Sequence, residues 1–354
     1  MKSYIYILIG FTLLNACVTD PEKELLKPES TGKLAEIILM TNKQYAAEYK
    51  NLLTPIFNTP IPGFPPPGEP SFKVQYTDES FFKGYFKKHH NIFVFITKDK
   101  MELFEPIFGK AILTSLLKNY QKNPDLIGIK QHNLFAKNQT VFFVLSEDKN
   151  SMIRKIEESN DQFLNIALKH ENKSGAQKLF GTGKRYTDAF SKRMLKEKYF
   201  TVQRPSTYRI AIENDDFVWL RKVSSVKEQQ FGILMFETKY KDTSDLSLQT
   251  ILAVRNSYTK KYIPGEIKGS YMKFSSAIEP IYRVSKLDRR YTIDINGWWD
   301  VQGDFMGGPS HIRVILDEKR NRLIYVEGFL FYPNEAKATS MREIDQILNS
   351  IIIR

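Results

Sequence analysis

The stretch Asn91-Ile92-Phe93-Val94-Phe95-Ile96-Thr97 decides the fold class of this chain. It is apolar almost throughout, is rich in β-branched and aromatic residues and has the length of a strand. Two other segments, 72–76 and 140–145, share this character. Segments with apolar residues at helical spacing lie between these strands, at 81–88, 113–121 and 151–170. This alternation predicts a mixed sheet that is covered by helices.

The residues before this region extend the same pattern. An apolar run predicts a strand at 34–40, and apolar residues at helical spacing predict a helix at 44–57. The following segment, 59–70, is rich in proline, which removes backbone donors and restricts the residue before it. We therefore expect a stiff loop or a polyproline segment at 59–70.

The second half of the chain also contains predicted strands and amphipathic helices. Strands are expected at 208–223, 231–240, 281–295, 312–317 and 322–331, and a helix at 246–261. Ser340 and Glu343 have the spacing of a capping box, which predicts the start of a C-terminal helix. The core face of that helix would comprise Met341, Ile344, Ile347, Leu348 and Ile351.

These elements predict an α+β fold with mixed, mainly antiparallel sheets covered by helices. The glycine-containing segment 173–184 breaks the pattern, so we place a boundary there, between an N-terminal half at 34–182 and a C-terminal half at 183–354. Both halves end on a strand followed by an amphipathic helix. Two pseudo-repeated halves that arose by duplication are therefore an alternative description.

The N-terminus has the pattern of a bacterial lipoprotein signal. Lys2, an apolar run at 4–14 and a small residue at the cut precede Cys17, the single cysteine of the chain. We expect residues 1–16 to be removed, Cys17 to be acylated and 17–33 to act as a polar tether. The alternative is an uncleaved signal anchor or a buried helix that ends in cysteine.

This signal predicts a lipid-anchored protein of the cell envelope, attached to the outer membrane on either its periplasmic or its surface face. The formal net charge of +12 would suggest nucleic acid as a partner in the cytoplasm, but outside it we expect none. The densest basic stretch, 184–198, has the spacing of an ordinary surface helix, with contact to anionic lipid or cell-wall polymers as the alternative.

Residues 297–311 hold the densest group of candidate binding residues and are expected to form a loop between two strands. Indoles stack on sugars or apolar groups, carboxylates bind cations or hydroxyls, and glycines admit a ligand close to the backbone. The candidates are Trp298, Trp299, Asp300, Asp304, Gly307 and Gly308. Arg255 could clamp an anion or these carboxylates. A structural role is the alternative for Arg255 and for the loop.

No catalytic residue, cofactor site or metal site is predicted. Ser310 and His311 are neighbours, and neighbours seldom form a catalytic triad with an aspartate such as Asp300 or Asp304. His89 and His90 would point to opposite faces if they belong to a strand. The sequence contains no phosphate-binding loop, dinucleotide fingerprint or serine-hydrolase elbow.

Several short segments carry a resemblance to a known family. They are Tyr262-Ile263-Pro264-Gly265, Gly269-Ser270-Tyr271-Met272, Trp298 and Phe305-Met306-Gly307-Gly308-Pro309, of which the last is the most specific. Other pieces that fit in order are Pro62-Gly63, Glu69-Pro70 with Phe72, Asn91-Ile92, Ala136-Lys137-Asn138-Gln139, Asp216-Phe217-Val218-Trp219-Leu220-Arg221 and Phe329 to Pro333 with the helix that follows. Together they resemble an uncharacterised lipoprotein family of the Bacteroidota, domain of unknown function 4837, over nearly the whole mature chain. The resemblance implies an envelope lipoprotein without an assigned activity.

Two functional hypotheses from different classes follow. The first is a non-catalytic binding or scaffolding lipoprotein that uses the loop around Trp298 to hold an envelope protein or glycan. The second is a hydrolase of envelope glycan or acylated substrate, with Asp300 and Asp304 as acid and base. Convergence of Arg255, the two aspartates and a tryptophan on one pocket would favour a site of either kind.

Overall fold

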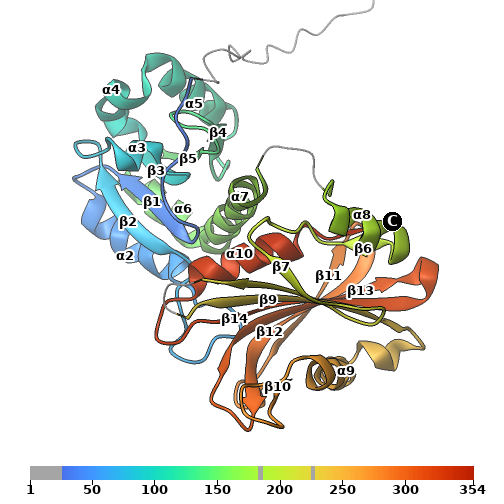
Figure 1. The fold of residues 1–354 in the computed structure, drawn as a ribbon. Coiled ribbons are helices and arrows are strands. Elements are labelled where there is room, and N and C mark those ends of the chain that lie inside the picture. Colours follow the sequence, from blue (N-terminus) through green and yellow to red (C-terminus); the bar gives the residue numbers. More distant parts are fainter. Residues whose placement is uncertain (1–25, 182–185, 225–227) are drawn as a thin grey trace, which may run out of the picture.

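Two large β-sheets organise the computed structural model, which describes residues 26–181, 186–224 and 228–354. Figure 1 shows one sheet in each half of the molecule, with the helices around them. The predicted signal peptide at 1–16 and the predicted attachment site Cys17 lie outside the described residues. Within those residues, no helix combines the length and the apolar character that a membrane span requires.

The N-terminal half is built on a five-stranded sheet with the order β2-β1-β3-β5-β4. Its strands are β1 (Glu36–Thr41), β2 (Lys73–Asp78), β3 (Asn91–Thr97), β4 (Ile129–His132) and β5 (Thr140–Ser146). The first four strands in spatial order are parallel, and only β4 at the edge is antiparallel. This confirms the mixed sheet, and the residue range predicted for the strand at 91–97 is the observed one.

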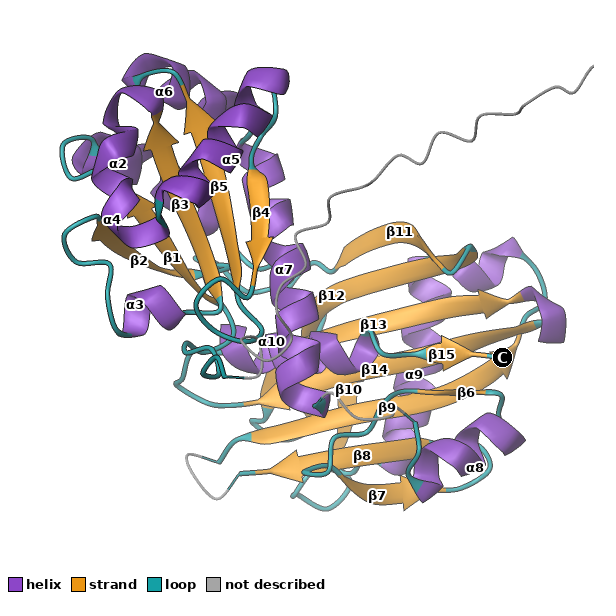
Figure 2. Cartoon of the chain, turned by 90° about the horizontal axis from the view of Figure 1, so that it is seen from above, coloured by secondary structure: helices purple, strands orange, loops and turns teal. Residues whose placement is uncertain are grey.

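Helices cover both faces of this sheet, as Figure 2 shows. They are α2 (Ala46–Phe57), α3 (Tyr85–Lys88), α4 (Glu105–Phe108), α5 (Lys110–Lys122), α6 (Lys149–Glu158) and α7 (Asn160–Phe180), with a 3-10 helix η1 (Lys98–Phe104). Alternate side chains of β3 enter opposite cores: Phe93 and Phe95 pack with α2, α6 and α7, while Val94 packs with α4 and α5. Both faces are buried, which explains the continuous apolar runs in the sequence.

Residues 26–33 of the predicted tether over 17–33 belong to the described part of the chain. Residues 28–32 lie against the N-terminal half, where the amide of Thr31 donates to Lys88 O (2.9 Å) and the amide of His90 donates to Thr31 O (3.0 Å). The amide of Lys137 donates to Pro28 O in the same way (2.8 Å). The prolines and glycine of this segment suggested a linker, but its backbone groups find partners on the folded body.

The segment 173–184 does not break the helical pattern at its first glycine. Helix α7 continues through Gly175 to Phe180, and Gly175 is buried where α7 packs against the C-terminal helix. A Cβ at Gly175 would lie 3.0 Å from the Nε2 of Gln346, so the glycine permits a close approach of two helices. It serves packing between the halves. It does not end the helix.

The C-terminal half contains an antiparallel sheet with the order β10-β12-β13-β14-β9-β8-β7, and β11 also pairs with β12. Its strands are β7 (Arg209–Glu213), β8 (Val218–Val223), β9 (Gln230–Lys239), β10 (Tyr271–Phe274), β11 (Ile281–Leu287), β12 (Arg290–Gln302), β13 (Gly307–Asp317) and β14 (Arg322–Phe331). Two short strands, β6 (Phe200–Thr201) and β15 (Ile352–Ile353), pair with each other. The fold class is thus α+β, with antiparallel pairs in the majority, as predicted.

Helices again cover both faces of the C-terminal sheet. They are α8 (Ala189–Glu197), α9 (Leu248–Tyr262) and α10 (Ala338–Leu348), with the 3-10 helices η2 (Thr243–Leu246) and η3 (Glu318–Arg320). Helix α9 packs on one face, and α8 and α10 pack on the other. The predicted core face of the last helix is confirmed, because Met341, Ile344, Ile347, Leu348 and Ile351 are all buried.

The alternative of two repeated halves is wrong at the level of topology. Neighbouring strands β1, β3 and β5 of the first sheet run parallel, whereas the C-terminal sheet is antiparallel throughout. A strand followed by a helix is common to many folds and carries little information about descent. Its recurrence in the sequence reflects general packing rules.

Two predicted strands are in fact hairpins. The segment 281–295 contains β11, a tight turn at Asp288 and Arg289, and the start of β12. Both turn residues have positive φ, 46° and 68°, which matches the twist of the flanking strands. The segment 208–223 likewise contains β7 and β8. In both segments the prediction overlooked polar residues that favour a turn, Asn214-Asp215-Asp216 and Asp288.

The capping box predicted at Ser340 and Glu343 does not start the last helix. Helix α10 begins at Ala338, and Oε2 of Glu69 accepts hydrogen bonds from the amides of Lys337 (2.6 Å) and Ala338 (2.9 Å). The hydroxyl of Ser340 instead accepts from Gln229 Nε2 (2.7 Å). A carboxylate from the proline-rich segment 59–70 therefore caps a helix of the other half.

The same proline-rich segment contacts the C-terminal sheet. It is a loop, as predicted, and Gly63 adopts φ of +79° against the backbone of β12. A Cβ at Gly63 would lie 2.5 Å from the carbonyl carbon of Asn296. Phe64 packs edge-on against Trp298, with ring centroids 6.2 Å apart. The loop thus joins the two halves.

Replacing Glu69 with alanine should lower the free energy of unfolding by about 1 kcal/mol, since two amides at the start of α10 lose their acceptor. Glu69→Gln keeps an acceptor oxygen and should recover part of this loss. Urea unfolding of both variants measures the effect. Equal stability of Glu69→Ala and the wild type would show that the cap contributes nothing.

Candidate functional site

The C-terminal sheet carries a cavity of about 270 Å³ on the face that packs against α9. Its walls come from β8, β10, β12 and β14 and from the segment after α9. Most of the lining is apolar: Trp219, Ile263, Met272, Trp299, Phe329 and Phe331 are among the side chains that form it. Arg221, Gln230 and Glu266 are the polar side chains in the lining.

Strand alternation explains which residues face the cavity. Trp299 and Val301 on β12 point to the α9 side and are 3% and 6% exposed. Trp298 and Asp300 point to the opposite face, where Trp298 meets Phe64. The segment 297–311, predicted to be a loop, is therefore mainly two paired strands, with a short turn between Gln302 and Gly307.

The two candidate carboxylates do not line the cavity. Asp300 lies opposite Lys273 of β10, with its Oδ1 3.7 Å from the ammonium nitrogen. Asp304 lies in the turn, and its oxygens accept from the amides of Phe305 (2.7 Å) and Glu266 (3.3 Å). Asp304 thereby fixes the turn to the segment that forms the mouth of the cavity.

Gly307 and Gly308 do not need unusual backbone angles. Positive φ in this turn belongs to Gly303, at +85°. Gly308 is needed because a Cβ there would lie 1.9 Å from Leu330 O, the atom that accepts the indole N–H of Trp299 at 3.1 Å. A Cβ at Gly307 would lie 2.9 Å from Trp299 O. Close approach of the backbone explains both glycines.

Arg255 is fully buried and satisfied within the core. Its Nε and Nη2 donate to the two carboxylate oxygens of Glu327 on β14, at 2.8 and 2.7 Å. The hydroxyl of Ser310 donates to the same carboxylate (2.7 Å). Arg255 therefore does not clamp the carboxylates Asp300 and Asp304. Its two hydrogen bonds to Glu327 favour the structural role instead.

Ser310 and His311 point to opposite faces of β13 and do not act together. His311 lies under α10 between Asp294 (2.9 Å) and Asp345 (2.8 Å). Burial disfavours its charge, but hydrogen bonds to the two aspartates outweigh burial and raise its pKa to about 9. His311 is thus a cation at neutral pH that joins the sheet to the last helix.

The raised pKa predicts a pH-dependent stability. His311 has an ordinary pKa of 6.5, so its contribution is complete below pH 6.5 and is lost as the pH rises towards 9. The contribution is roughly 3 kcal/mol from the shift of the pKa. The stability difference between wild type and His311→Gln, measured by urea unfolding, should therefore shrink between pH 6.5 and 9. A constant difference would contradict this assignment.

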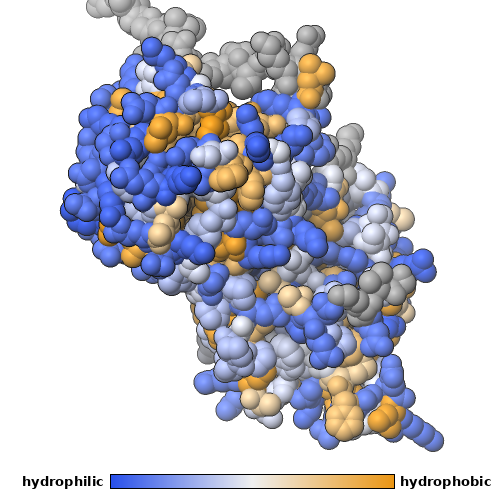
Figure 3. Space-filling view, turned by 90° about the vertical axis from the view of Figure 1, so that its left-hand side faces the viewer, coloured by the Kyte–Doolittle hydropathy of each residue, from blue (hydrophilic) through white to orange (hydrophobic). Residues whose placement is uncertain are grey.

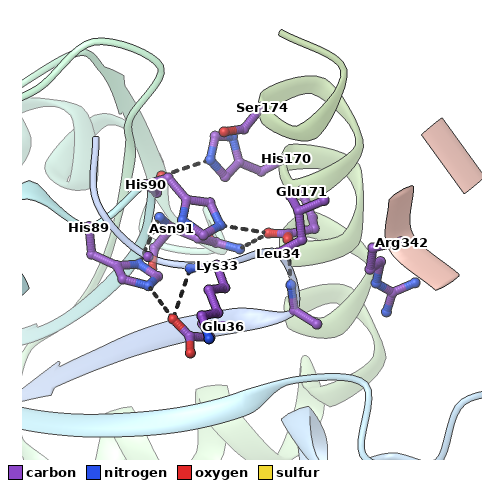
Figure 4. Close-up of polar contacts among 12 residues, drawn as sticks. Lys33, Leu34, Glu36, His89, His90, Asn91, His170, Glu171, Ser174 and Arg342 are labelled. Carbon is purple, nitrogen blue, oxygen red and sulfur yellow. Dashed lines mark hydrogen bonds and ion pairs between the residues drawn. The ribbon is translucent and has the colours of Figure 1, made fainter. Parts of the chain in front are cut away.

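A buried cluster of histidines lies in the N-terminal half, where residues 31–35 meet α7 and the segment before β3 (Figure 4). His90 Nε2 and Glu171 Oε2 are 3.0 Å apart, and Glu171 Oε1 accepts from the amide of Ala35 (2.6 Å). The rings of His89 and His90 stack at 4.5 Å, so they do not point to opposite faces. The reason is that both precede β3, which starts at Asn91.

Burial keeps two of these histidines neutral. Burial lowers the pKa of His89 to about 2 and that of His170 to about 4, and His90 nearby adds to the effect on His89. The described part of the chain contains no group of three or more histidine, cysteine or carboxylate side chains that could hold a metal ion. The cluster fastens residues 31–35 to α7.

Most residues that line the cavity were not among the predicted site residues. Of the predicted residues, only Trp299 lines it. Trp219 and Arg221 lie on the same face of β8, and Phe329 and Phe331 on the same face of β14. Their spacing in the sequence could have placed each pair on one face of its own strand. No local signal shows that both pairs lie on the same face of one sheet, because β9 joins β8 and β14 only in the fold.

Comparisons with known proteins assign a domain to each half. Residues 188–350 match the family model described as Domain of unknown function (DUF4837), which confirms the resemblance for the C-terminal half. Residues 30–180 match a different one, Domain of unknown function (DUF8532), so the resemblance does not extend over the whole mature chain. The crystal structure of human STARD10 aligns over 46% of this chain and 74% of its own, at 10% identity and a TM-score of 0.23. No curated protein matches the sequence.

Proposed function

We propose that this protein is a non-catalytic, lipid-anchored binding protein of the bacterial envelope. Its ligand site would be the mainly apolar cavity between the C-terminal sheet and the segment that follows α9. The observation that carries this proposal is the cavity itself, which is lined by aromatic and aliphatic side chains with a few polar groups. Such a lining is typical of small-molecule sites.

The binding site of this proposal differs from the one that the sequence suggested. The two tryptophans Trp298 and Trp299 point to opposite faces, and the two aspartates lie outside the cavity. No observation therefore favours Asp300 and Asp304 as the acid and base of a hydrolase. The size and mainly apolar lining of the cavity favour a small molecule with an apolar part over an envelope protein or glycan.

Binding can be tested with the neutral fluorescent probe N-phenyl-1-naphthylamine and the mature chain, residues 17–354 with Cys17→Ser. The probe should bind to the wild-type cavity and bind much more weakly to Val301→Phe, which fills it. Val284→Phe is the matched control, because Val284 is exposed on β11 and does not line the cavity. It should bind as the wild type does.

A melting curve shows whether Val301→Phe is folded. If it is not, Met306→Trp fills the cavity from the less buried turn and replaces it in the test. Absence of probe binding to the wild type, or equal binding to the wild type and a folded filled variant, would contradict the proposed function.

The envelope location rests on the N-terminal signal and requires a separate test. Full-length chain with Cys17→Ser, expressed in a bacterium with a lipoprotein export pathway, should move from the membrane pellet to the soluble fraction, since it lacks the acylated thiol. Retention of the variant in a salt-washed pellet would show that something other than the lipid holds the protein.

A further inference from the structure

We infer that the cavity binds an anionic amphiphile with a single short apolar chain, whose carboxylate or phosphate pairs with Arg221. This inference rests on the proposed function and names the chemical class of its ligand. It starts from the charged side chain in an otherwise mainly apolar lining.

Arg221 lies on β8 and is half-buried in the cavity wall. Its Nη2 donates to Gln230 Oε1 (2.6 Å), and its guanidinium lies over the ring of Trp219, 5.6 Å from the centroid. Within the described parts of the chain, it makes no other hydrogen bond and no ion pair. These two contacts hold the guanidinium in place, and its other N–H groups can donate hydrogen bonds to the oxygens of an anionic ligand.

Many other arginines of the C-terminal half already have a carboxylate partner. Seven of them pair with carboxylates in the folded chain, namely Arg193, Arg204, Arg255, Arg313, Arg320, Arg322 and Arg342. Arg221 instead lies directly opposite Arg209 of β7, and no ion pair of Arg209 exists among the described residues either. Like charges opposite each other on one sheet face destabilise it, and a bound anion would relieve this repulsion.

The apolar part of the ligand would occupy the space between Trp299, Met272 and Phe329, which form the cavity wall beside Trp219. Its volume of about 270 Å³ is just below the roughly 300–1,000 Å³ of ordinary small-molecule sites. This size favours one short chain over the two chains of a phospholipid.

Exposed apolar side chains and one acidic side chain lie at the mouth of the cavity. Phe305 is fully exposed in the turn beside Met306, and Ile267 is 54% exposed in the segment that Asp304 joins to this turn. Apolar atoms are visible at the lower end of the C-terminal half in Figure 3. Glu266 also lines the mouth, so a cationic amphiphile is the competing ligand class that the experiment must include.

The experiment compares four ten-carbon ligands by displacement of N-phenyl-1-naphthylamine from the mature chain with Cys17→Ser. They are decanoate, decyl phosphate, 1-decanol and decyltrimethylammonium. At least one of the two anions should bind about tenfold or more tightly than 1-decanol, because a charge-assisted bond to Arg221 is added. Preference between the two anions identifies the head group as carboxylate or phosphate.

Variants then assign the preference to Arg221. Arg221→Gln should bind 1-decanol and the probe as the wild type does but lose the preference for anions, while Arg221→Lys should recover part of it. Arg283→Gln is the matched control, since Arg283 is exposed on β11 and does not line the cavity. It should keep the full preference.

The inference and the proposed function can fail separately. Probe binding with equal affinity for 1-decanol and both anions, a preference for the cation, or an anion preference that survives Arg221→Gln would overturn the inference alone. Failure of the probe to bind would overturn the proposed function and the inference together.

Discussion

Arg255→Met should lower the free energy of unfolding by about 3–5 kcal/mol, one of the two largest losses that we expect from a single substitution in the C-terminal half. Arg255 and Glu327 are both fully buried, and two hydrogen bonds of 2.8 and 2.7 Å join them. Removing the guanidinium leaves the carboxylate of Glu327 buried without its counter-charge. Urea unfolding monitored by circular dichroism measures the loss.

Two further variants test whether the loss of stability comes from the unpaired buried charge of Glu327. The double variant Arg255→Met with Glu327→Met should recover much of the lost stability, since no unpaired charge remains. Arg193→Met breaks an ion pair at the surface, with Glu213, and should change the stability by less than about 1 kcal/mol. If Arg255→Met were as mild as Arg193→Met, the buried pair would not be a stability determinant.

Gly308→Ala should cost about 3 kcal/mol or more, or prevent folding, although alanine adds a single methyl group. That methyl would lie 1.9 Å from Leu330 O, so β13 and β14 must separate and the bond from Trp299 Nε1 to Leu330 O must weaken. Thermal melting and the yield of soluble protein report the effect.

Gly303→Ala provides the comparison for Gly308→Ala. Gly303 has φ of +85° but no contact closer than 3.7 Å, so alanine there costs only backbone strain, about 1–2 kcal/mol. Gly303→Asn should cost less, because asparagine tolerates positive φ. Equal losses at Gly303 and Gly308 would show that close approach is not the reason for Gly308.

Hydrophobic patterning predicted the elements whose environment is simple. The strands β3 (Asn91–Thr97) and β14 (Arg322–Phe331) were predicted to the residue, because both are mainly apolar and are buried on both faces. The core face of α10 followed from its helical period in the same way.

Features that depend on distant contacts could not be predicted. Glu69 caps α10 although 269 positions separate it from Ala338, so the local capping box was the wrong signal. The glycines and tryptophans at 297–308 suggested a loop, because glycine in a strand has meaning only when the neighbouring backbone is known. The cavity combines residues from Trp219 to Phe331, and only the fold brings them together.

Native mass spectrometry of the lipid-anchored protein, purified from the envelope of the cells that produce it, tests the central claim most directly. We predict that the wild type carries a single-chain anionic amphiphile as a bound mass and that the folded cavity-filling variant Val301→Phe does not. A wild-type protein without any bound amphiphile, or equal occupancy in Val301→Phe, would contradict the claim that the cavity is the binding site of this protein.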